Sequence, residues 1–310
     1  MARSTGIRRR NAPGDCGTLP TYPSSWWSLP LRPFIRHRVA LAVGILATGL
    51  WLGEALLQGQ RVDVDVRIAQ PAGAQPVRTR ADATLQHPVG PWEFYFTRAI
   101  YSGNGRGRRW GSRWATDYPK ADLQFISILQ RVTRLGVYES ENAIRLDDPN
   151  LRRFPFLYAL EVGSMAMSEK EVAGLRSYLD AGGFLLVDDF WGTWEWQNFE
   201  MEIRRVLPEY PIVDVPVDHP VFHTVYEINE VLQVPAVNNA VYGGRTWERD
   251  GYVPETRAIF DEDGRMMVMI NWNTDLGDAW EWADNPYYPL KFSTYAFQMG
   301  VNYIVYAMTH

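Results

Sequence analysis

The sequence is poor in cysteine and lysine, and each scarcity excludes something. Its 310 residues include one cysteine, Cys16, so an intramolecular disulfide and a cysteine-rich metal site are both excluded. No thiol follows residue 16, which also excludes a thiolate nucleophile in the main body of the chain. There are three lysines among 31 basic residues. We interpret this bias toward arginine as a trace of a GC-rich genome and not as anion recognition at every arginine.

Acidic residues are scarce at the amino end. Residues 1–60 contain seven arginines and two acids, although the whole chain has a net charge of −5. The rest of the chain is therefore acidic. A nucleic-acid binder would carry its basic surface on the folded domain, so this distribution predicts no nucleic-acid partner. A short basic head on an acidic body is instead typical of a membrane-topology signal.

Long apolar runs are also rare, and the one that stands out is Val39–Leu57, in which Glu54 is the only charged residue. As a helix it would span about 28 Å, close to the hydrocarbon thickness of a bilayer. Arg32, Arg36 and Arg38 precede it, which predicts a cytoplasmic amino end and an extracytoplasmic body. We predict an uncleaved membrane anchor. A cleaved signal peptide is the alternative, and it leads to the same side of the membrane.

Composition divides the chain into four parts. Residues 1–38 are rich in Arg, Pro, Gly and Ser and predict a disordered cytoplasmic head. Residues 39–57 form the predicted transmembrane helix, and residues 58–90, with three prolines and many small side chains, predict an extended linker. Residues 91–310 contain the apolar patterning of a globular domain.

Strand and helix patterns alternate through residues 91–310. Predicted strands lie at 92–101, 154–162, 184–187 and 211–215, and predicted helices at 117–134, 168–179, 194–207 and 293–309. Ser168 and Glu171 form a capping box, Gly182-Gly183 end that helix, and residues 258–272 predict a hairpin that turns at Asp263-Gly264. The alternation predicts one α/β domain, a mainly parallel sheet covered on both faces, with the late hairpin at a mixed edge.

Seven segments of this domain carry a family resemblance. They are FYFTRAIYSG with WATDYPKAD, FPFLYALEVG, MSEKEVAGLRSYLDAGGFLLVDDFWG, DHPVFHTVY, DEDGRMMVMINWNTDLGDAWE and the closing GVNYIVYAMTH. Residues 92–310 resemble the bacterial domain of unknown function 4159 family. The resemblance implies a flavodoxin-like three-layer core similar to class I glutamine amidotransferases and ThuA-like proteins. It also implies an envelope protein with an amino-terminal membrane segment, and it implies no particular activity.

The sequence departs from the amidotransferases at one decisive position. Those enzymes use a cysteine at a tight turn between a strand and a helix. The corresponding turn follows the predicted strand 184–187 and reads Asp188-Asp189-Phe190-Trp191-Gly192. Cysteine-dependent glutaminase chemistry is therefore excluded.

The two acids at this turn are candidate ligand-binding residues. In open parallel sheets, ligands bind beyond the carboxyl ends of the strands, where Asp188 and Asp189 are predicted to emerge. The pair could hold a divalent cation or serve as acid and base. The alternative is structural: one carboxylate caps the next helix and the other pairs with an arginine such as Arg204.

A second acidic segment, NTDLGDAWEW, could complete the same site. Its acids Asp275, Asp278 and Glu281 lie within seven residues, although acids in a solvated loop are the commoner explanation of such a pattern. We hypothesise that the cleft also draws on the first strand. The candidate ligand-binding residues are Asp188, Asp189, Asp278, Glu281, Arg98 and Tyr101. The sequence assigns none of them as a metal ligand and identifies no cofactor.

The glycine-rich segment YSGNGRGRRW after the first strand is a candidate anion-binding loop. Gly103, Gly105, Arg106 and Arg108 could offer backbone N–H groups and guanidinium groups to an anion. The spacing matches neither a dinucleotide fingerprint nor a P-loop, and a flexible surface loop is the alternative.

Several tryptophans lie near the acids in sequence, and sugar-binding sites combine aromatic platforms with carboxylates. Core packing is the alternative for such large side chains. The function that we predict is a membrane-anchored extracytoplasmic domain that binds a ligand or a protein partner of the cell envelope. The alternatives are a carboxylate-dependent hydrolase that acts on a sugar or cell-wall substrate, and a structural subunit of a membrane complex.

Overall fold

The computed structural model describes residues 90, 92–104 and 113–310. The predicted head, membrane segment and linker, together with Cys16, lie outside the described residues. Among the described helices, none combines the length and the apolar character that a membrane span requires. The description below therefore concerns the folded domain alone.

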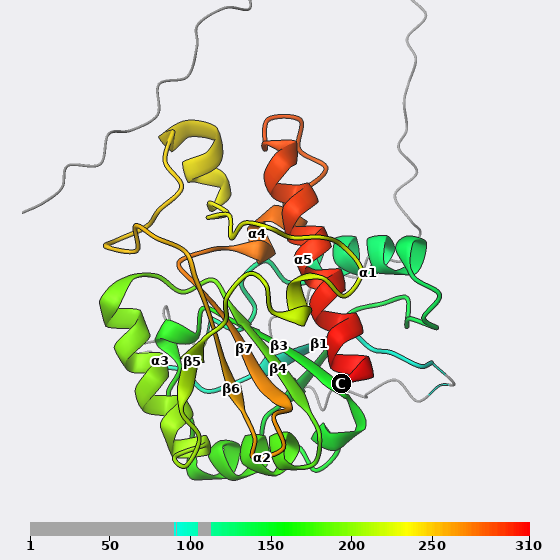
Figure 1. Ribbon diagram of the computed structural model, residues 1–310, viewed down its shortest axis with the longest axis vertical. Coiled ribbons are helices and arrows are strands. Elements are labelled where there is room, and N and C mark those ends of the chain that lie inside the picture. The colour runs from blue at the N-terminus through cyan, green and yellow to red at the C-terminus, as the bar shows by residue number, and fades with distance from the viewer. Residues whose placement is uncertain (1–89, 91, 105–112) are drawn as a thin grey trace, which may run out of the picture. The chain divides into compact units, whose positions relative to one another are not determined.

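A seven-stranded mixed sheet forms the middle of the domain (Figure 1). Its strands are β1 (Thr97–Ile100), β2 (Asn142–Arg145), β3 (Phe156–Leu160), β4 (Phe184–Asp188), β5 (Ile212–Asp214), β6 (Glu255–Phe260) and β7 (Met266–Trp272). Their spatial order is β2-β1-β3-β4-β7-β6-β5. The first five strands in this order are parallel. At the edge, β6 pairs antiparallel with β7, and β5 pairs antiparallel with β6. The mainly parallel sheet with a mixed edge is thus confirmed.

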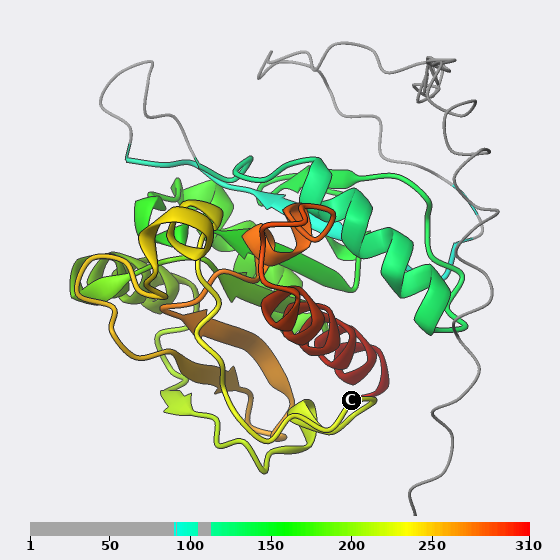
Figure 2. The same cartoon turned by 90° about the horizontal axis from the view of Figure 1, so that it is seen from above.

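Helices cover both faces of the sheet and make a three-layer sandwich (Figure 2). They are α1 (Lys120–Val132), α2 (Glu169–Asp180), α3 (Gly192–Val206), α4 (Leu276–Glu281) and α5 (Leu290–Thr309). Residues of α1, α4 and α5 share one apolar core, which includes Phe125 and Trp280. Residues of α2 and α3 share the core on the other face, with Leu175 and Ile203. This architecture fits a flavodoxin-like kind of fold.

Local sequence signals explain several of these elements. The Ser168 side chain accepts a hydrogen bond from the Glu171 N–H, and the Glu171 carboxylate accepts one from the Ser168 N–H, which completes the predicted capping box of α2. Gly182 follows α2 with a φ of +99°, a conformation that favours glycine. The antiparallel pair β6–β7 turns at Gly264, which has a φ of +81°. The capping box, the glycine stop and the hairpin are confirmed.

Other predicted boundaries were wrong. The first strand is β1, shorter than the predicted 92–101, and the helix predicted over 117–134 begins only at Lys120. Asp117 has a φ of +61°, which is incompatible with a right-handed helix. Strand β2 was not predicted, because its four residues, NAIR, are too few to show a period. The acids Asp278 and Glu281 lie on helix α4 and not in a loop.

Candidate functional site

Three residues with left-handed backbone follow three neighbouring parallel strands. Glu161 follows β3, Asp189 follows β4 and Asn273 follows β7, with φ values of 54°, 50° and 61°. The Glu161 N–H donates to the Asp189 carbonyl oxygen at 3.0 Å, and the Asp189 N–H donates to the Thr274 carbonyl oxygen at 3.1 Å. These bonds join the three turns at the carboxyl edge of the sheet. Strained backbone of this kind clusters at functional sites.

The remaining non-glycine residues with positive φ in the described part of the chain belong to the same region. Asp117 lies just before α1. Arg249, with a φ of 49°, forms an ion pair with Glu195 of α3 at 2.7 Å. The non-glycine residues with left-handed backbone in this part of the chain are therefore all charged or amide residues near one edge of the sheet.

Five carboxylates meet at this edge, and we call them the acidic site: Asp117, Asp189, Asp275, Asp278 and Glu281. Asp117, Asp189 and Asp275 each place one oxygen within 4.8 Å of the others, and Asp117, Asp278 and Glu281 do the same. The two groups share Asp117. Asp189 and Asp275, 86 positions apart in the sequence, converge because β4 and β7 are parallel neighbours that end at the same edge. Asp117 joins them from the segment before α1.

Asp188 is fully buried and holds the start of α4 in place. Its Oδ2 atom accepts hydrogen bonds from the Tyr158 hydroxyl at 3.0 Å and from the N–H groups of Leu276 at 2.8 Å and Gly277 at 3.2 Å. One of the two adjacent acids therefore does cap a helix, but the helix is α4 and not the next one in sequence. Arg204 pairs with Glu200 and with neither aspartate.

Helix α4 carries the other acids. Asp275 precedes the helix, and its Oδ1 atom accepts a hydrogen bond from the Asp278 N–H at 2.7 Å. The Oδ2 atom of Asp278 accepts one from the Val237 N–H at 2.6 Å. Because Asp188 holds the same helix end, the positions of Asp275 and Asp278 depend on the packing of α4 against β4.

Burial sets the protonation behaviour of these acids. Burial and the repulsion of neighbouring carboxylates hold the pKa values of Asp117, Asp189 and Asp275 well above their usual range. Burial also raises the pKa of Asp188 to about 7, although its hydrogen bonds to Tyr158 and α4 oppose this rise. Acids with such perturbed pKa values in one place are typical of functional sites.

Nearby basic side chains pair with other acids. Within the described residues, no ion pair reaches the five members of the acidic site. The neighbouring pairs are Arg98–Asp122, Arg113–Glu161, Lys120–Asp284 and Arg249–Glu195. Against the effect of burial, Arg98 still lowers the pKa of Asp117, and Lys120 lowers that of Glu281, so their charges act on the acidic site without a direct ion pair.

Glu161 forms a second feature beside the acidic site. Burial raises its pKa to about 7, while Arg113 lowers it and Glu195 raises it. Its charge is also the largest electrostatic contribution, after burial, to the raised pKa of Asp189. A carboxyl group that titrates near neutrality next to another acid can exchange protons with a ligand.

The two residues predicted from the first strand lie beneath the site. Arg98 is fully buried, pairs with Asp122 and donates to the carbonyl oxygen of Thr116 at 2.7 Å. The Tyr101 hydroxyl donates to the Leu160 carbonyl oxygen at 2.7 Å, which holds the end of β3. The structure places both as supports of the turns and not among the converging carboxylates.

The predicted anion loop is described only in part. Gly103 pairs with Met165 in an isolated bridge. Gly105, Arg106 and Arg108 lie outside the described residues.

The tryptophans mostly pack in the core or against the acids. Trp280 is fully buried, and the Trp191 indole N–H donates to Asp189 Oδ1 at 2.9 Å. Trp194, at the start of α3, is 61% exposed. Of these tryptophans, only exposed ones such as Trp194 could stack against a sugar.

Sequence reasoning missed Asp117 and Glu161. Glu161 directly follows a buried apolar run, and the rule that singled out Asp188 and Asp189 would also have found it. Asp117 was assigned to a helix. Its signal was weaker, since aspartate is one of the few residues that tolerate a left-handed conformation.

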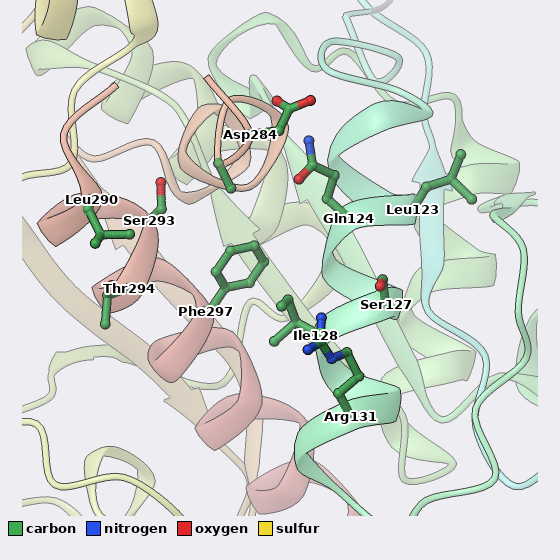
Figure 3. A pocket seen from close by; sticks show the side chains of 11 residues that line it. Leu123, Gln124, Ser127, Ile128, Arg131, Asp284, Leu290, Ser293, Thr294 and Phe297 are labelled. Atoms are coloured by element: carbon green, nitrogen blue, oxygen red, sulfur yellow. The ribbon is translucent and has the colours of Figure 1, made fainter. Parts of the chain in front are cut away.

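A groove of about 580 Å³ lies between α1, α5 and the segment after α4 (Figure 3). Leu123, Ile128, Leu290 and Phe297 give it an apolar lining. The acid on its rim, Asp284, pairs with Lys120. This groove contains none of the five converging carboxylates.

A search of curated proteins finds no match to the chain. A family model described as a domain of unknown function, DUF4159, matches residues 96–308, which include β1 to α5 and every member of the acidic site. The chain therefore belongs to the DUF4159 family.

Proposed function

We propose that this protein is a membrane-anchored extracytoplasmic domain that binds a ligand of the cell envelope at the acidic site. The lack of any cysteine after residue 16 excludes a cysteine-dependent amidotransferase. The proposal extends the resemblance of the fold to class I amidotransferases, which keep their nucleophile at the same edge of the sheet. In this protein carboxylates take the place of the thiol at that edge.

The observation that carries the proposal is the convergence of the five carboxylates. Burying ionised groups near one another costs several kcal/mol unless something balances them. A fold under selection for stability alone has no reason to bring Asp117, Asp189 and Asp275 within 4.8 Å. The arrangement is therefore best explained by a ligand that interacts with these oxygens.

The location rests on sequence features outside the described residues. The apolar segment Val39–Leu57 and the arginines before it support an anchored body on the extracytoplasmic side. Positively charged ligands that the acidic site could attract include metal ions and molecules with protonated amino groups. Soluble peptidoglycan fragments carry free amino groups and occur in this compartment, which makes them suitable probes.

The test uses the full chain in detergent and a mixture of soluble peptidoglycan fragments. We expect the fragments to raise the thermal unfolding midpoint of the native protein. Asp189→Asn should abolish this rise while changing the free energy of unfolding by less than about 2 kcal/mol. The control is Asp263→Asn, because Asp263 is exposed in the turn between β6 and β7, at the end of β7 opposite the acidic site.

Two outcomes would contradict the proposal. One is a native protein whose midpoint does not respond to the fragments. The other is an equal rise in the native protein and in Asp189→Asn, which would place the binding site elsewhere.

A carboxylate-dependent hydrolase is a second candidate, and Glu161 favours it. A carboxyl group whose pKa lies at about 7, beside a second acid, suits general acid–base catalysis at neutral pH. If the protein is a hydrolase, mass spectrometry of the same fragment mixture will show cleaved bonds. Glu161→Gln should then lower the cleavage rate by about 100-fold or more without preventing binding.

A further inference from the structure

We propose that Asp117, Asp189 and Asp275 bind a divalent cation of the oxygen-preferring class, namely Mg²⁺, Mn²⁺ or Ca²⁺. This inference rests on the proposed function, since it names the group through which the acidic site would hold its ligand. Asp278 and Glu281 lie beside the cation as the second group of carboxylates that includes Asp117.

The geometry suits a hard cation. The three oxygens lie within 4.8 Å of one another, and cations of this class sit about 2.0–2.6 Å from each oxygen ligand. A single ion between the three carboxylates therefore reaches all of them with small side-chain adjustments. No histidine or cysteine belongs to either group of converging ligands in the described part of the chain, which disfavours zinc.

An unpartnered oxygen points to a missing ligand. Asp117 Oδ2 is buried and has no hydrogen-bond partner. It lies against Gly277, where a side-chain Cβ would come within 2.7 Å of it. A buried carboxylate oxygen without a partner is costly, and a bound cation supplies the partner that the protein does not.

Other groups already hold two of the three carboxylates in place. The Trp191 indole N–H donates to Asp189 Oδ1 at 2.9 Å, and the Asp278 N–H donates to Asp275 Oδ1 at 2.7 Å. Hydrogen bonds of this kind orient carboxylate ligands in metal sites. The left-handed turn at Asp189 and the end of β7 fix the backbones that carry them.

Three carboxylates leave coordination positions open. Mg²⁺ takes six ligands and Ca²⁺ six to eight, so water or an oxygen of a bound ligand would complete the shell. The cation would thus convert an acidic site into one that also attracts oxygen-rich or anionic ligands.

Proton sharing among the acids is the explanation without a cation, because their pKa values are raised. It predicts that the native protein takes up no divalent cation.

The experiment measures cation binding to the full chain in detergent after treatment with EDTA and removal of the chelator. Isothermal titration with Mg²⁺, Ca²⁺ and Mn²⁺, and electron paramagnetic resonance of Mn²⁺, report the binding. We expect a saturable site for at least one of the three. Asp189→Asn and Asp275→Asn should each weaken the affinity by about 100-fold or more. The control Asp263→Asn, in the exposed turn between β6 and β7, should keep the native affinity.

Circular dichroism of each variant shows whether it is folded. A thermal shift of the native protein between cation and EDTA tests the same inference without any variant. The inference is overturned if the native protein shows no saturable binding of any of the three cations. It is also overturned if folded Asp189→Asn and Asp275→Asn bind as tightly as the native protein.

The outcomes also separate this inference from the proposed function. If peptidoglycan fragments bind but the native protein shows no saturable binding of any of the three cations, the proposed function stands and the cation site is rejected. If the cation binds with the expected variant pattern while the fragments do not bind, the cation site stands and the proposed ligand is rejected.

Discussion

Arg98 is predicted from sequence as a ligand contact, yet the structure gives it a different task. It is fully buried in an ion pair with Asp122, which is also fully buried. Its guanidinium donates to the carbonyl oxygens of Trp114 and Thr116, which precede Asp117. Arg98 therefore shapes the segment that delivers Asp117 to the acidic site.

We expect Arg98→Met to destabilise the domain by about 3–5 kcal/mol, because it leaves Asp122 buried without its partner. Arg98→Lys should restore only part of the loss, since lysine cannot reproduce the forked hydrogen bonds to Asp122 and the two carbonyl oxygens. Urea unfolding of the full chain measures both effects.

The matched control for Arg98 is Arg204→Met. Arg204 pairs with Glu200 one helical turn away, and about half of the Arg204 side chain is exposed. Surface pairs of this type contribute within about 0.5 kcal/mol. Equal losses in the two variants would show that the buried pair has no special importance.

Adjacent residues can have separate roles at the end of a strand. Asp188 closes β4 and points to the face covered by α4, where it accepts two helix N–H groups. Asp189 leaves the strand in a left-handed turn and joins Asp117 and Asp275. Because the backbone changes direction between Asp188 and Asp189, the two side chains have different roles: Asp188 holds α4, and Asp189 belongs to the acidic site.

At the scale of elements, helix α4 links buried Asp188, which accepts hydrogen bonds from its N–H groups, to the acids Asp278 and Glu281 that it carries. It has six residues and begins after the short turn that follows β7. Gly277, in its first turn, packs against Asp117 and Tyr158. The close approach requires the absence of a side chain at this position.

We expect Gly277→Ala to disturb the acidic site without changing any charge. Its Cβ would lie 2.7 Å from Asp117 Oδ2 and 2.9 Å from the Tyr158 hydroxyl. Overpacking of this kind costs about 1–3 kcal/mol, and it should also weaken Mn²⁺ binding by displacing Asp117. Titration with Mn²⁺ and urea unfolding measure the two effects.

Gly182→Ala is the comparison for this variant. Gly182 has a φ of +99° with open space around it. It precedes β4, whereas Asp189 follows the other end of that strand, so alanine should lower stability and leave Mn²⁺ binding unchanged. If Gly277→Ala binds Mn²⁺ as the native protein does, α4 does not control the position of Asp117.

Elements with strong local signals were predicted well, and elements without them were not. The capping box at Ser168, the stop at Gly182 and the apolar strand β4 depend on neighbouring residues alone. The start of α1 and the short strand β2 depend on the rest of the fold. Strand β2 is stabilised by pairing with β1, and four residues show no period by themselves.

At the scale of the whole molecule, topology across the membrane is the remaining prediction. The arginines before Val39–Leu57 predict a cytoplasmic amino end and an external body. A reporter that is active only outside the cytoplasm, fused after residue 310, should therefore be active. A reporter that is active only in the cytoplasm should be silent at the same position, and activity there would refute the prediction.

The sequence by itself determined the fold class, the absence of thiol chemistry and the presence of acids beyond β4. These follow from local periodicity, composition and the rule that parallel strands end at one edge. It did not determine that Asp117 joins Asp189 and Asp275, because they lie 72 and 158 positions from Asp117 along the chain. The pairing of β4 with β7 and the left-handed turns bring Asp189 and Asp275 together, and the segment held by Arg98 brings Asp117 to them. Secondary structure follows largely from interactions between residues that are close in sequence, whereas side chains that are distant in sequence come together only once the sheet has formed.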